Sequence, residues 1–380
     1  GALITDVNGN QLDGDGEGIA GGTYNFWFNV TAPNDTIFVD KTADSMQPDG
    51  SLDNPFTQID EALEIAESGD IVRIISNAGN DNDLSTAEDN EPYLIGFDYL
   101  SGSELADGGN VLIPNGVTLM VDAGVVIKSR RGRIAVGSSS EQVDRSRSAL
   151  QILGVPRVFD ANGDVIRDAD AVARKGSVYI TSLYDDSRGE TPTGLIPPGA
   201  VAAPGDWGGI EIRNDIDKDR DDRFLYSEHG IFLTTISNAE IAFGGGNVVV
   251  DGKLETVSPI TLHDARPTIV NNLIENNADA AISANPDSFE ETNYNTPFYQ
   301  SMGFTLDYDR VGPDVYGNSI VGNSINGLFV RVDTAAGMDT EVLTTAAGWD
   351  DTDIVHVLTE NLKIVGTPGG HFADSTAPPM

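Results

Sequence analysis

Cysteine is absent from this sequence of 380 residues, and histidine occurs only four times. The chain therefore cannot form disulfides, use a thiolate as a nucleophile or bind zinc through cysteine. Long hydrophobic runs are also absent, because no apolar stretch approaches the roughly 18 residues that a membrane-spanning helix needs. The opening "GALITDVNGNQLDGDGEG" lacks an initiator Met and the regions of a signal peptide, so we expect an internal or processed segment of a longer polypeptide.

Basic residues are scarce, since 22 Lys and Arg stand against 60 Asp and Glu and give a formal net charge of −38. A surface of this kind repels phosphate groups, which argues against nucleic-acid or membrane partners. It attracts cations instead. We therefore expect divalent ions or high ionic strength to relieve the self-repulsion of the chain.

Glycine and proline are plentiful, at 42 and 18 residues, and show no collagen period. From residue 111 onward they combine with Asn and Asp to break up short apolar runs such as "VLIPNGVTLMVDAGVVIK", "GDWGGIEIR" and "ISNAEIAFGGGNVVVDG". Runs this short are shorter than the strands of most β-sandwiches. Hydrophobic residues make up 39% of the chain, enough for a core, so the pattern predicts an all-β fold with many turns.

An internal repeat indicates the architecture. The stretch "PTIVNNLIENNADAAISAN", residues 267–285, aligns with "PDVYGNSIVGNSINGLFVR", residues 313–331, and places Ile269 on Val315. The same offset of 46 residues places Asn272 on Asn318, Ile274 on Ile320, Asn277 on Asn323, Ala281 on Gly327 and Ile282 on Leu328. A fixed period is typical of solenoids, and we interpret 46 residues as two turns of about 23 residues each.

The stretches "DNPFTQIDEALEIAESGDIVRI", "GVTLMVDAGVVIK", "APGDWGGIEI" and "PTIVNNLIENNADAAISAN" together resemble the right-handed parallel β-helix proteins of the pectate-lyase-like superfamily. The resemblance spans residues 34–370. Within the superfamily, the sequence looks like the β-helix modules of very large secreted or surface proteins of bacteria, planctomycete-like ones especially. The resemblance implies a right-handed parallel β-helix solenoid with a short N-terminal capping helix.

Three further segments complete the predicted organisation. Residues 1–33 hold two short β-type runs and resemble the terminal strand pair of an immunoglobulin-like β-sandwich, whose other strands lie upstream or in a neighbouring chain. Asn54 as N-cap and Pro55 as first helical residue predict the capping helix near residues 55–67. Residues 371–380 form a tail.

Asparagines crowd among the apolar positions of the repeat. In a turn between strands, an Asn can pair its amide with the equivalent residue of another turn, and it tolerates a left-handed backbone. This favours a structural ladder, formed by Asn272, Asn277, Asn318 and Asn323. A polar face that binds sugars is the alternative.

Acidic and amide side chains near the N-terminus indicate a possible calcium site. The candidate ligands are Asp6, Asn8, Asn10, Asp13, Asp15 and Glu17. The last three stand at alternate positions before Gly18, as in the first half of an oxygen-ligand loop. Tyr24 stands where such a loop has its closing glutamate, so a solvated acidic turn is the alternative. The second acidic stretch, "NDIDKDRDDR", is interrupted by Lys and Arg and predicts an exposed, self-paired charged loop.

The resemblance also raises the possibility of an enzyme. Polysaccharide lyases of this fold hold a uronate with calcium and acidic residues and use an Arg or Lys as the base. Lys128 and Arg131, in the basic run "KSRRGR", are the candidates for that base. The alternative is a belt of cations that neutralises acidic neighbours. Asp185 and Asp186 are adjacent, as in polygalacturonases, but the Gly-His element is missing, so they predict a loop that leaves a strand.

Two tryptophans complete the set of candidate residues. Trp207, between glycines in "GDWGG", predicts a residue packed in the core or in a turn, with a sugar-stacking platform as the alternative. Trp349 is the better candidate for a surface aromatic.

Composition and resemblance together favour a non-catalytic structural module, a segment of a surface layer, filament or adhesin. We expect it to be extracellular or at the cell surface, stabilised by calcium, with copies of itself or neighbouring modules as partners and no nucleic acid or membrane insertion. The alternative is a carbohydrate-active β-helix protein, either a calcium-dependent polysaccharide lyase or a glycan binder.

Overall fold

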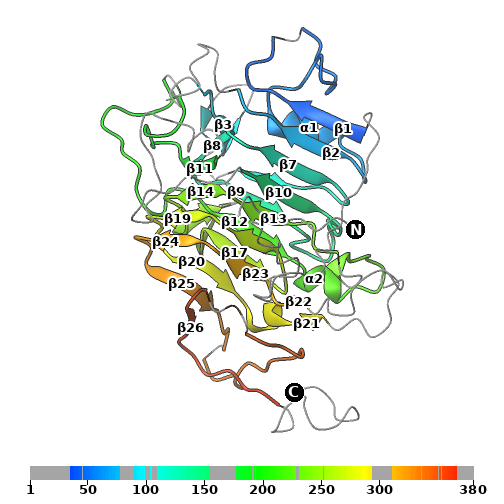
Figure 1. Cartoon of the computed structure of the whole chain (residues 1–380), viewed down its shortest axis with the longest axis vertical. Coiled ribbons are helices and arrows are strands. Elements are labelled where there is room, and N and C mark those ends of the chain that lie inside the picture. Colours follow the sequence, from blue (N-terminus) through cyan, green and yellow to red (C-terminus); the bar gives the residue numbers. More distant parts are fainter. Residues whose placement is uncertain are drawn as a thin grey trace, which may run out of the picture.

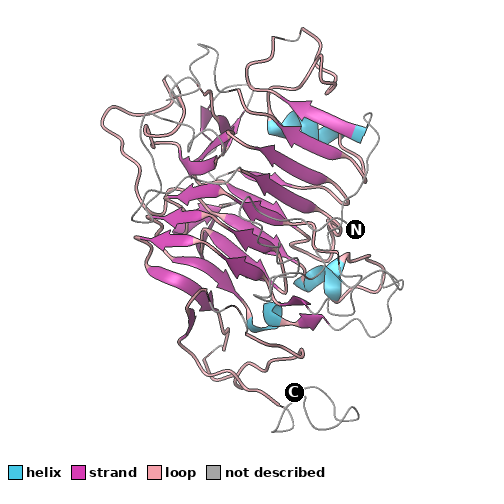
Figure 2. Cartoon of the chain, in the orientation of Figure 1, coloured by secondary structure: helices cyan, strands magenta, loops and turns pink. Residues whose placement is uncertain are grey.

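Three parallel β-sheets run along the long axis of the computed structural model (Figure 1). In the part of the chain that the structure describes, sheets A and C have seven strands each and sheet B has six. The chain passes from sheet A to sheet B to sheet C and then returns to sheet A one strand further along, so each circuit is one rung of a solenoid. Figure 2 shows that strands make up the stack. The predicted all-β parallel fold is confirmed.

The structure describes residues 35–44, 46–77, 90–98, 103–104, 109–154, 177–190, 192, 194–227, 231–250, 252–292, 310–334, 336–349, 351 and 353–365. The predicted sandwich strand pair at residues 1–33 and the predicted tail at residues 371–380 lie outside these ranges.

The three sheets have these strands, each given in spatial order. Sheet A consists of β1 (Thr36–Val39), β2 (Ile71–Ile74), β7 (Thr118–Asp122), β10 (Ala149–Leu153), β13 (Thr235–Ser237), β18 (Thr268–Val270) and β23 (Asp314–Tyr316). Sheet B consists of β3 (Tyr93–Ile95), β8 (Val126–Ser129), β11 (Val178–Ser182), β14 (Ala239–Ala242), β19 (Leu273–Glu275) and β24 (Ser319–Val321). Sheet C consists of β6 (Asn110–Leu112), β9 (Arg133–Val136), β12 (Ile210–Arg213), β17 (Ile260–His263), β20 (Ala280–Ala284), β25 (Ile325–Val330) and β26 (His356–Leu358).

The remaining elements lie between the strands of the rungs. Among the described residues there are three short antiparallel pairs, formed by β4 (Phe97–Asp98) with β5 (Ser103–Glu104), β15 (Gly246–Val250) with β16 (Lys253–Val257), and β21 (Glu291–Thr292) with β22 (Arg310–Val311). The helices in the same part of the chain are α1 (Ile59–Ile65), α2 (Asp215–Lys218) and the 3₁₀ helix η3 (Pro286–Phe289). None of the helices in the described ranges has the length and apolar character needed to span a bilayer.

Inward-facing side chains form continuous columns, because each strand pairs in register with its equivalent in the next rung. The longest column in sheet A contains Val39, Ile74, Val121, Ile152, Ile236, Ile269 and Val315. Every one of these side chains is at most 1% exposed. Branched aliphatic residues suit such a column, since they are stiff at χ1 and pack well against like neighbours on a pleated surface. The columns of the three sheets merge into one hydrophobic core.

The 46-residue repeat is one rung and not two. Ile269 pairs directly with Val315, and Ile274 pairs directly with Ile320, so the predicted register is right but the predicted spacing of two turns is wrong. The rung is long because η3 and the segment that follows it are inserted between β20 and β23. A rung without an insertion is close to the predicted 23 residues, because Thr261 pairs with Ser283, 22 residues later.

Asn272 and Asn318 lie one above the other at the turn between sheets A and B. The amide oxygen of Asn318 accepts hydrogen bonds from the backbone N–H of Asn272 (2.9 Å) and from its side-chain amide (3.0 Å). The Asn272 oxygen in turn accepts from the backbone N–H of Ala239 at 2.9 Å. Each side-chain amide also donates to a strand carbonyl of the rung below, Asn272 to Ile236 and Asn318 to Ile269.

A second ladder with the same bonds stands at the turn between sheets B and C. The amide oxygen of Asn323 accepts from the backbone N–H of Asn277 (3.1 Å) and from its side-chain amide (2.7 Å). The Asn277 oxygen accepts from the backbone N–H of Gly244 at 2.7 Å. The ladder side chains therefore satisfy main-chain groups that the turns would otherwise leave unpaired inside the protein.

The residue before each ladder asparagine has a left-handed backbone. Asn271 has φ 57° and Asn276 has φ 56°, and glycines take these positions in the next rung, Gly317 with φ 64° and Gly322 with φ 70°. Asn and Gly are the residues that adopt this conformation most readily. In each "NN" or "GN" pair of the sequence, the first residue therefore forms the bend and the second forms the ladder.

The N-terminal end of the core is covered by α1, whose Ile59, Ala62 and Leu63 are buried. The predicted cap therefore exists, but the prediction that it starts at Pro55 is wrong. Phe56 donates its N–H to Phe38 and accepts from the N–H of Asp40 at the edge of sheet A. These bonds hold the main chain extended, so the helix starts only at Ile59.

The C-terminal end of sheet A is closed by carboxylates. The backbone N–H groups of Val315 and Gly317, on and after β23, donate to Asp351 and Asp353, each at 3.2 Å. Charged groups that occupy an edge strand block the addition of another strand. At the neighbouring edge of sheet C, β26 pairs with β25 and continues the sheet.

Asn272→Gly is expected to lower the free energy of unfolding by roughly 3 kcal/mol, because it leaves the Ala239 N–H and the Ile236 carbonyl without partners and adds backbone freedom. Asn271→Gly is the matched control and is expected to change the stability by less than about 1 kcal/mol, because its φ suits glycine. Urea titrations followed by circular dichroism measure both. Equal losses in the two variants would contradict the ladder.

Candidate functional site

Polar side chains gather on the outer face of sheet B. Ile180 of β11 and Ile241 of β14 point into the core, so Tyr179, Thr181 and Glu240 point outward. The loop after β11 folds back against this face and closes one side of a hollow of about 230 Å³. We call it the sheet B groove, and its polar lining includes Tyr179, Thr181, Asp185, Arg188, Glu240 and Glu275.

An ion pair crosses the sheet B groove from the loop to the sheet. Arg188 donates from Nε and Nη2 to one carboxylate oxygen of Glu240, at 3.1 and 2.9 Å. The two side chains are only 12% and 6% exposed. Burial opposes the charge of Arg188, but Glu240 outweighs it, so the pKa of Arg188 is raised. The guanidinium also lies 5.3 Å from the centre of the Tyr179 ring.

Asp185 fixes the turn that closes the groove. Its carboxylate accepts from the Thr181 hydroxyl at 2.7 Å and from the N–H and hydroxyl of Ser187 at 3.0 and 2.6 Å. Asp186 beside it is exposed. The two aspartates follow the end of β11 at Ser182, which confirms the prediction of a loop that leaves a strand. They do not form a catalytic pair.

The groove offers hydrogen-bonding groups, and two of its carboxylates are engaged by neighbouring side chains. Glu240 and Asp185 are engaged by Arg188, Thr181 and Ser187. The Tyr179 ring is 2% exposed and cannot serve as a stacking platform. Chemically, this arrangement of donors and acceptors can hold a small ligand rich in hydroxyl groups.

Lys128 lies one rung earlier on the same outer face, where it pairs with Thr181 across the sheet. Its side chain has no solvent exposure, and its ammonium donates to the carbonyls of Asp185 (2.8 Å) and Glu190 (3.0 Å). Burial lowers the pKa of Lys128 from 10.5 to about 8, against the opposing effect of nearby carboxylates. A base beneath a loop cannot reach a polymer, so the structure argues against Lys128 as a lyase base.

Arg131 lies in the turn between β8 and β9, with φ 58° and a partly exposed side chain. Its neighbours in the basic run pair with acidic residues. Arg130 lies 3.3 Å from Asp206, and Arg133 lies 3.1 Å from Glu211. The predicted alternative, a belt of cations that neutralises acidic neighbours, describes these pairs.

The six candidate calcium ligands, from Asp6 to Glu17, lie outside the described residues. Within the ranges that the structure covers, no three His, Asp or Glu side chains are grouped as metal ligands. The second acidic stretch is self-paired only in part, because Lys218 lies 3.5 Å from Glu290, outside the stretch. Asp217 of α2 lies 2.7 Å from Arg223, and it differs from the prediction in being buried, because it also accepts the N–H of Ser138.

Both tryptophans take the predicted environments. Trp207 is fully buried and donates from its indole N–H to the carbonyl of Ala242 at 2.8 Å. Trp349 is 42% exposed. Its ring stacks on His356 and meets Phe289 edge to face, with centroids 6.3 and 5.5 Å away.

Comparison with known proteins gives no family for this chain, because no family model, curated protein or solved structure matches it. Any function must therefore be argued from the chain's own residues.

Sequence reasoning did not find the sheet B groove. Its residues come from β11, β14 and β19 and from the loop between β11 and β12, which are far apart in the sequence. One signal was available, since Tyr179, Thr181 and Glu240 alternate with core isoleucines. The position of Arg188 above them depends on the path of the loop.

Raising the pH from 8 to 10 is expected to stabilise the native protein relative to Lys128→Met. In this window the unfolded chain retains the Lys128 proton, while the folded chain, whose pKa is about 8, has released it, so the folded state is favoured as the pH rises. Urea midpoints of both proteins at each pH measure the effect. Parallel pH profiles would show that Lys128 is not buried as described.

Glu240→Gln is expected to lower the free energy of unfolding by about 2 kcal/mol, somewhat less than the loss for a fully buried pair, because Arg188 keeps slight solvent access. Asp222→Asn is the control, since its partner Arg220 is exposed and the pair is screened by water. Thermal melting of both variants measures the difference. A control that melts as early as Glu240→Gln would contradict the importance of burial.

Proposed function

We propose that this chain is a non-catalytic structural module of a large extracellular or cell-surface protein, built as a β-helix of the pectate-lyase-like superfamily. The observation that carries the proposal is the continuous main hydrophobic core, which includes residues from Ile37 of β1 to Val330 of β25 and Ile354 beyond it. A solenoid with such a core gains length by adding rungs, and each rung contacts only its neighbours. This suits a spacer in a surface layer, a filament or an adhesin.

The charge distribution supports a role outside the cytoplasm in contact with cations. Many of the described arginines already hold a carboxylate, as Arg73 holds Asp122 and Arg331 holds Asp279. With a net charge of −38, a large excess of acidic groups remains. Divalent cations lower the repulsion within such a surface and between copies of it.

The proposed partners and the proposed calcium site both rest on the sequence of residues 1–33. We expect the strand pair predicted at residues 1–33 to complete a sandwich in a copy of the chain or in a neighbouring module, by addition of strands. We expect calcium, held by the predicted ligands Asp13, Asp15 and Glu17, to favour that assembly.

End-to-end assembly in calcium is the expected behaviour of the isolated chain, with a return to monomers in EDTA. Light scattering and negative-stain images measure it. Asp13→Asn with Asp15→Asn should remove the calcium response without changing the melting temperature of the solenoid. A chain that stays monomeric at every calcium concentration would contradict self-assembly.

A glycan binder is the second candidate, and the sheet B groove favours it over a lyase. Its lining combines an arginine, carboxylates and hydroxyls on the outer face of the solenoid. Incubation with uronate polymers and calcium is expected to give no unsaturated product that absorbs in the ultraviolet, whereas a glycan array tests retention. Product that disappears in Arg131→Ala would contradict a non-catalytic role.

A further inference from the structure

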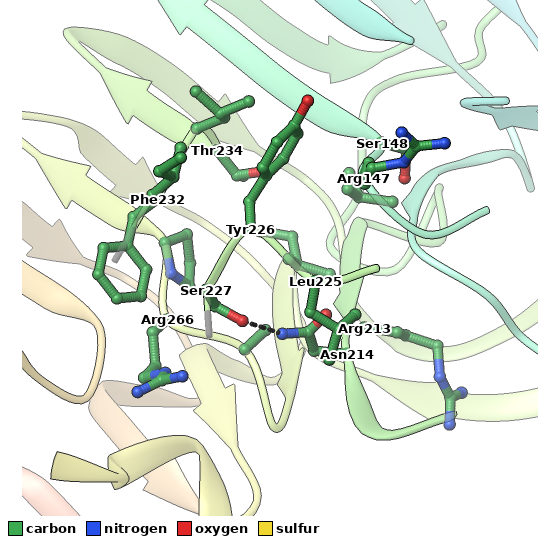
Figure 3. Close-up of a pocket in the computed structure, with 16 residues that line it drawn as sticks. Arg147, Ser148, Arg213, Asn214, Leu225, Tyr226, Ser227, Phe232, Thr234 and Arg266 are labelled. Atoms are coloured by element: carbon green, nitrogen blue, oxygen red, sulfur yellow. Dashed lines mark hydrogen bonds between the residues drawn. The ribbon is translucent and has the colours of Figure 1, made fainter. Parts of the chain in front are cut away.

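A second hollow, of about 80 Å³, lies at the corner where the chain leaves sheet C and returns to sheet A. Arg147 and Ser148 contribute from the turn just before β10, and Tyr226 and Thr234 contribute from the segment before β13 (Figure 3). We call it the Arg147 pocket. It shares no lining residue with the sheet B groove. The inference drawn from it does not depend on the proposed structural role.

The charged residues that line the Arg147 pocket are basic, whereas the chain as a whole is strongly acidic. It includes three arginines, Arg147, Arg213 and Arg266, and no Asp or Glu is among the described residues that line it. Elsewhere the acidic residues of this chain greatly outnumber the basic ones. A pocket of this composition favours an anion.

Two of the three arginines are already neutralised. Arg213 lies 2.6 Å from Asp215, and Arg266 lies 3.7 Å from Glu290. In Figure 3 the Arg213 side chain extends away from the Tyr226 ring, and Arg266 lies beyond Phe232. Arg147 is therefore the arginine whose charge is available to a ligand.

Arg147 has a neutral partner, whereas most of the described arginines pair with carboxylates. Its Nη2 donates to the side-chain oxygen of Asn115 at 3.1 Å, and its guanidinium lies 6.0 Å from the Phe224 ring. No described carboxylate forms an ion pair with Arg147, and the buried Nε of Arg147 has no hydrogen-bond acceptor among the described residues. A buried donor of a charged group without an acceptor is costly, so an oxyanion that accepts from it would be stabilised.

Hydroxyl groups add further donors. The Ser148 oxygen accepts from the N–H of Gly137 at 2.9 Å, and the Thr234 oxygen accepts from the N–H of Leu150 at 3.3 Å. Because each hydroxyl already accepts, its own hydrogen remains available to donate. Figure 3 shows Arg147 and Ser148 on one side of the Tyr226 ring and Thr234 on the other.

We propose that the Arg147 pocket binds a small oxyanion, a sulfate, phosphate or carboxylate group. The planar guanidinium matches such groups with two parallel hydrogen bonds. A hollow of about 80 Å³ has room for one oxyanion group, and a larger ligand would place its charged substituent there. The net charge of the chain does not prevent this, because charges beyond about 10 Å are screened at 0.1 M salt.

The test is isothermal titration calorimetry of the full chain with sodium sulfate and with trigalacturonate, at constant ionic strength. Saturable binding at one site is expected, weakened at least tenfold in Arg147→Gln and less in Arg147→Lys, which keeps the charge but not the fork. Arg73→Gln removes the same charge from sheet A, where Arg73 pairs with Asp122. It should bind within about twofold of the native chain, because it leaves the pocket intact.

The two ligands identify the source of the oxyanion. Sulfate binding without tighter binding of trigalacturonate assigns a free inorganic ion, and tighter binding of trigalacturonate assigns the carboxylate of an acidic glycan. Circular dichroism checks that each variant is folded. If Arg147→Gln does not fold, the comparison is made with Arg147→Lys alone. Absence of saturable heat with both ligands, or equal affinity in the Arg147 and Arg73 variants, overturns the proposal.

Discussion

The hydrogen bonds between successive parallel strands are the interaction on which the rest of this structure depends. They hold each strand about 4.8 Å from the equivalent strand of the next rung, so an inward residue always meets its own counterpart above and below. A column such as Ile152, Ile236 and Ile269 therefore has to be apolar throughout. A polar group in the column would lie between apolar neighbours on both sides without a partner.

The same stacking imposes a demand at every bend, because a turn interrupts the main-chain ladder and leaves N–H and carbonyl groups inside the protein. Asn272 and Asn277 meet the demand, since each amide accepts from and donates to the main chain of the preceding rung and also donates to the asparagine of the next rung. Only some bends are filled in this way. Other bends carry inserted segments, such as the loop over Lys128 and the hairpin of β15 with β16. These inserted segments make the faces of the solenoid different from one another.

Charge is distributed according to this division. The inward columns of the described strands contain no charged side chains. Charged outward side chains on adjacent strands pair with opposite charges, as Arg133 does with Glu211. Such pairs cover the sheet faces without adding a hydrophobic surface that would associate indiscriminately. The Arg147 pocket departs from the pattern, since its arginine faces an amide and not a carboxylate. The departure occurs in the turn before β10, next to Asn115 of the preceding rung.

The sequence by itself determined the class of fold, the register of residues 267–285 on residues 313–331 and the burial of Trp207, because these depend on local alternation and on a repeat visible along the chain. Only the tertiary structure decided that 46 residues make one rung, that the helix starts at Ile59, and that Lys128 is covered. It also decided which side chains meet in the sheet B groove and the Arg147 pocket. The physical reason is that insertions have no repeat to specify their path. Their side chains reach the solenoid through contacts between residues far apart in the sequence, and local patterns do not record such contacts.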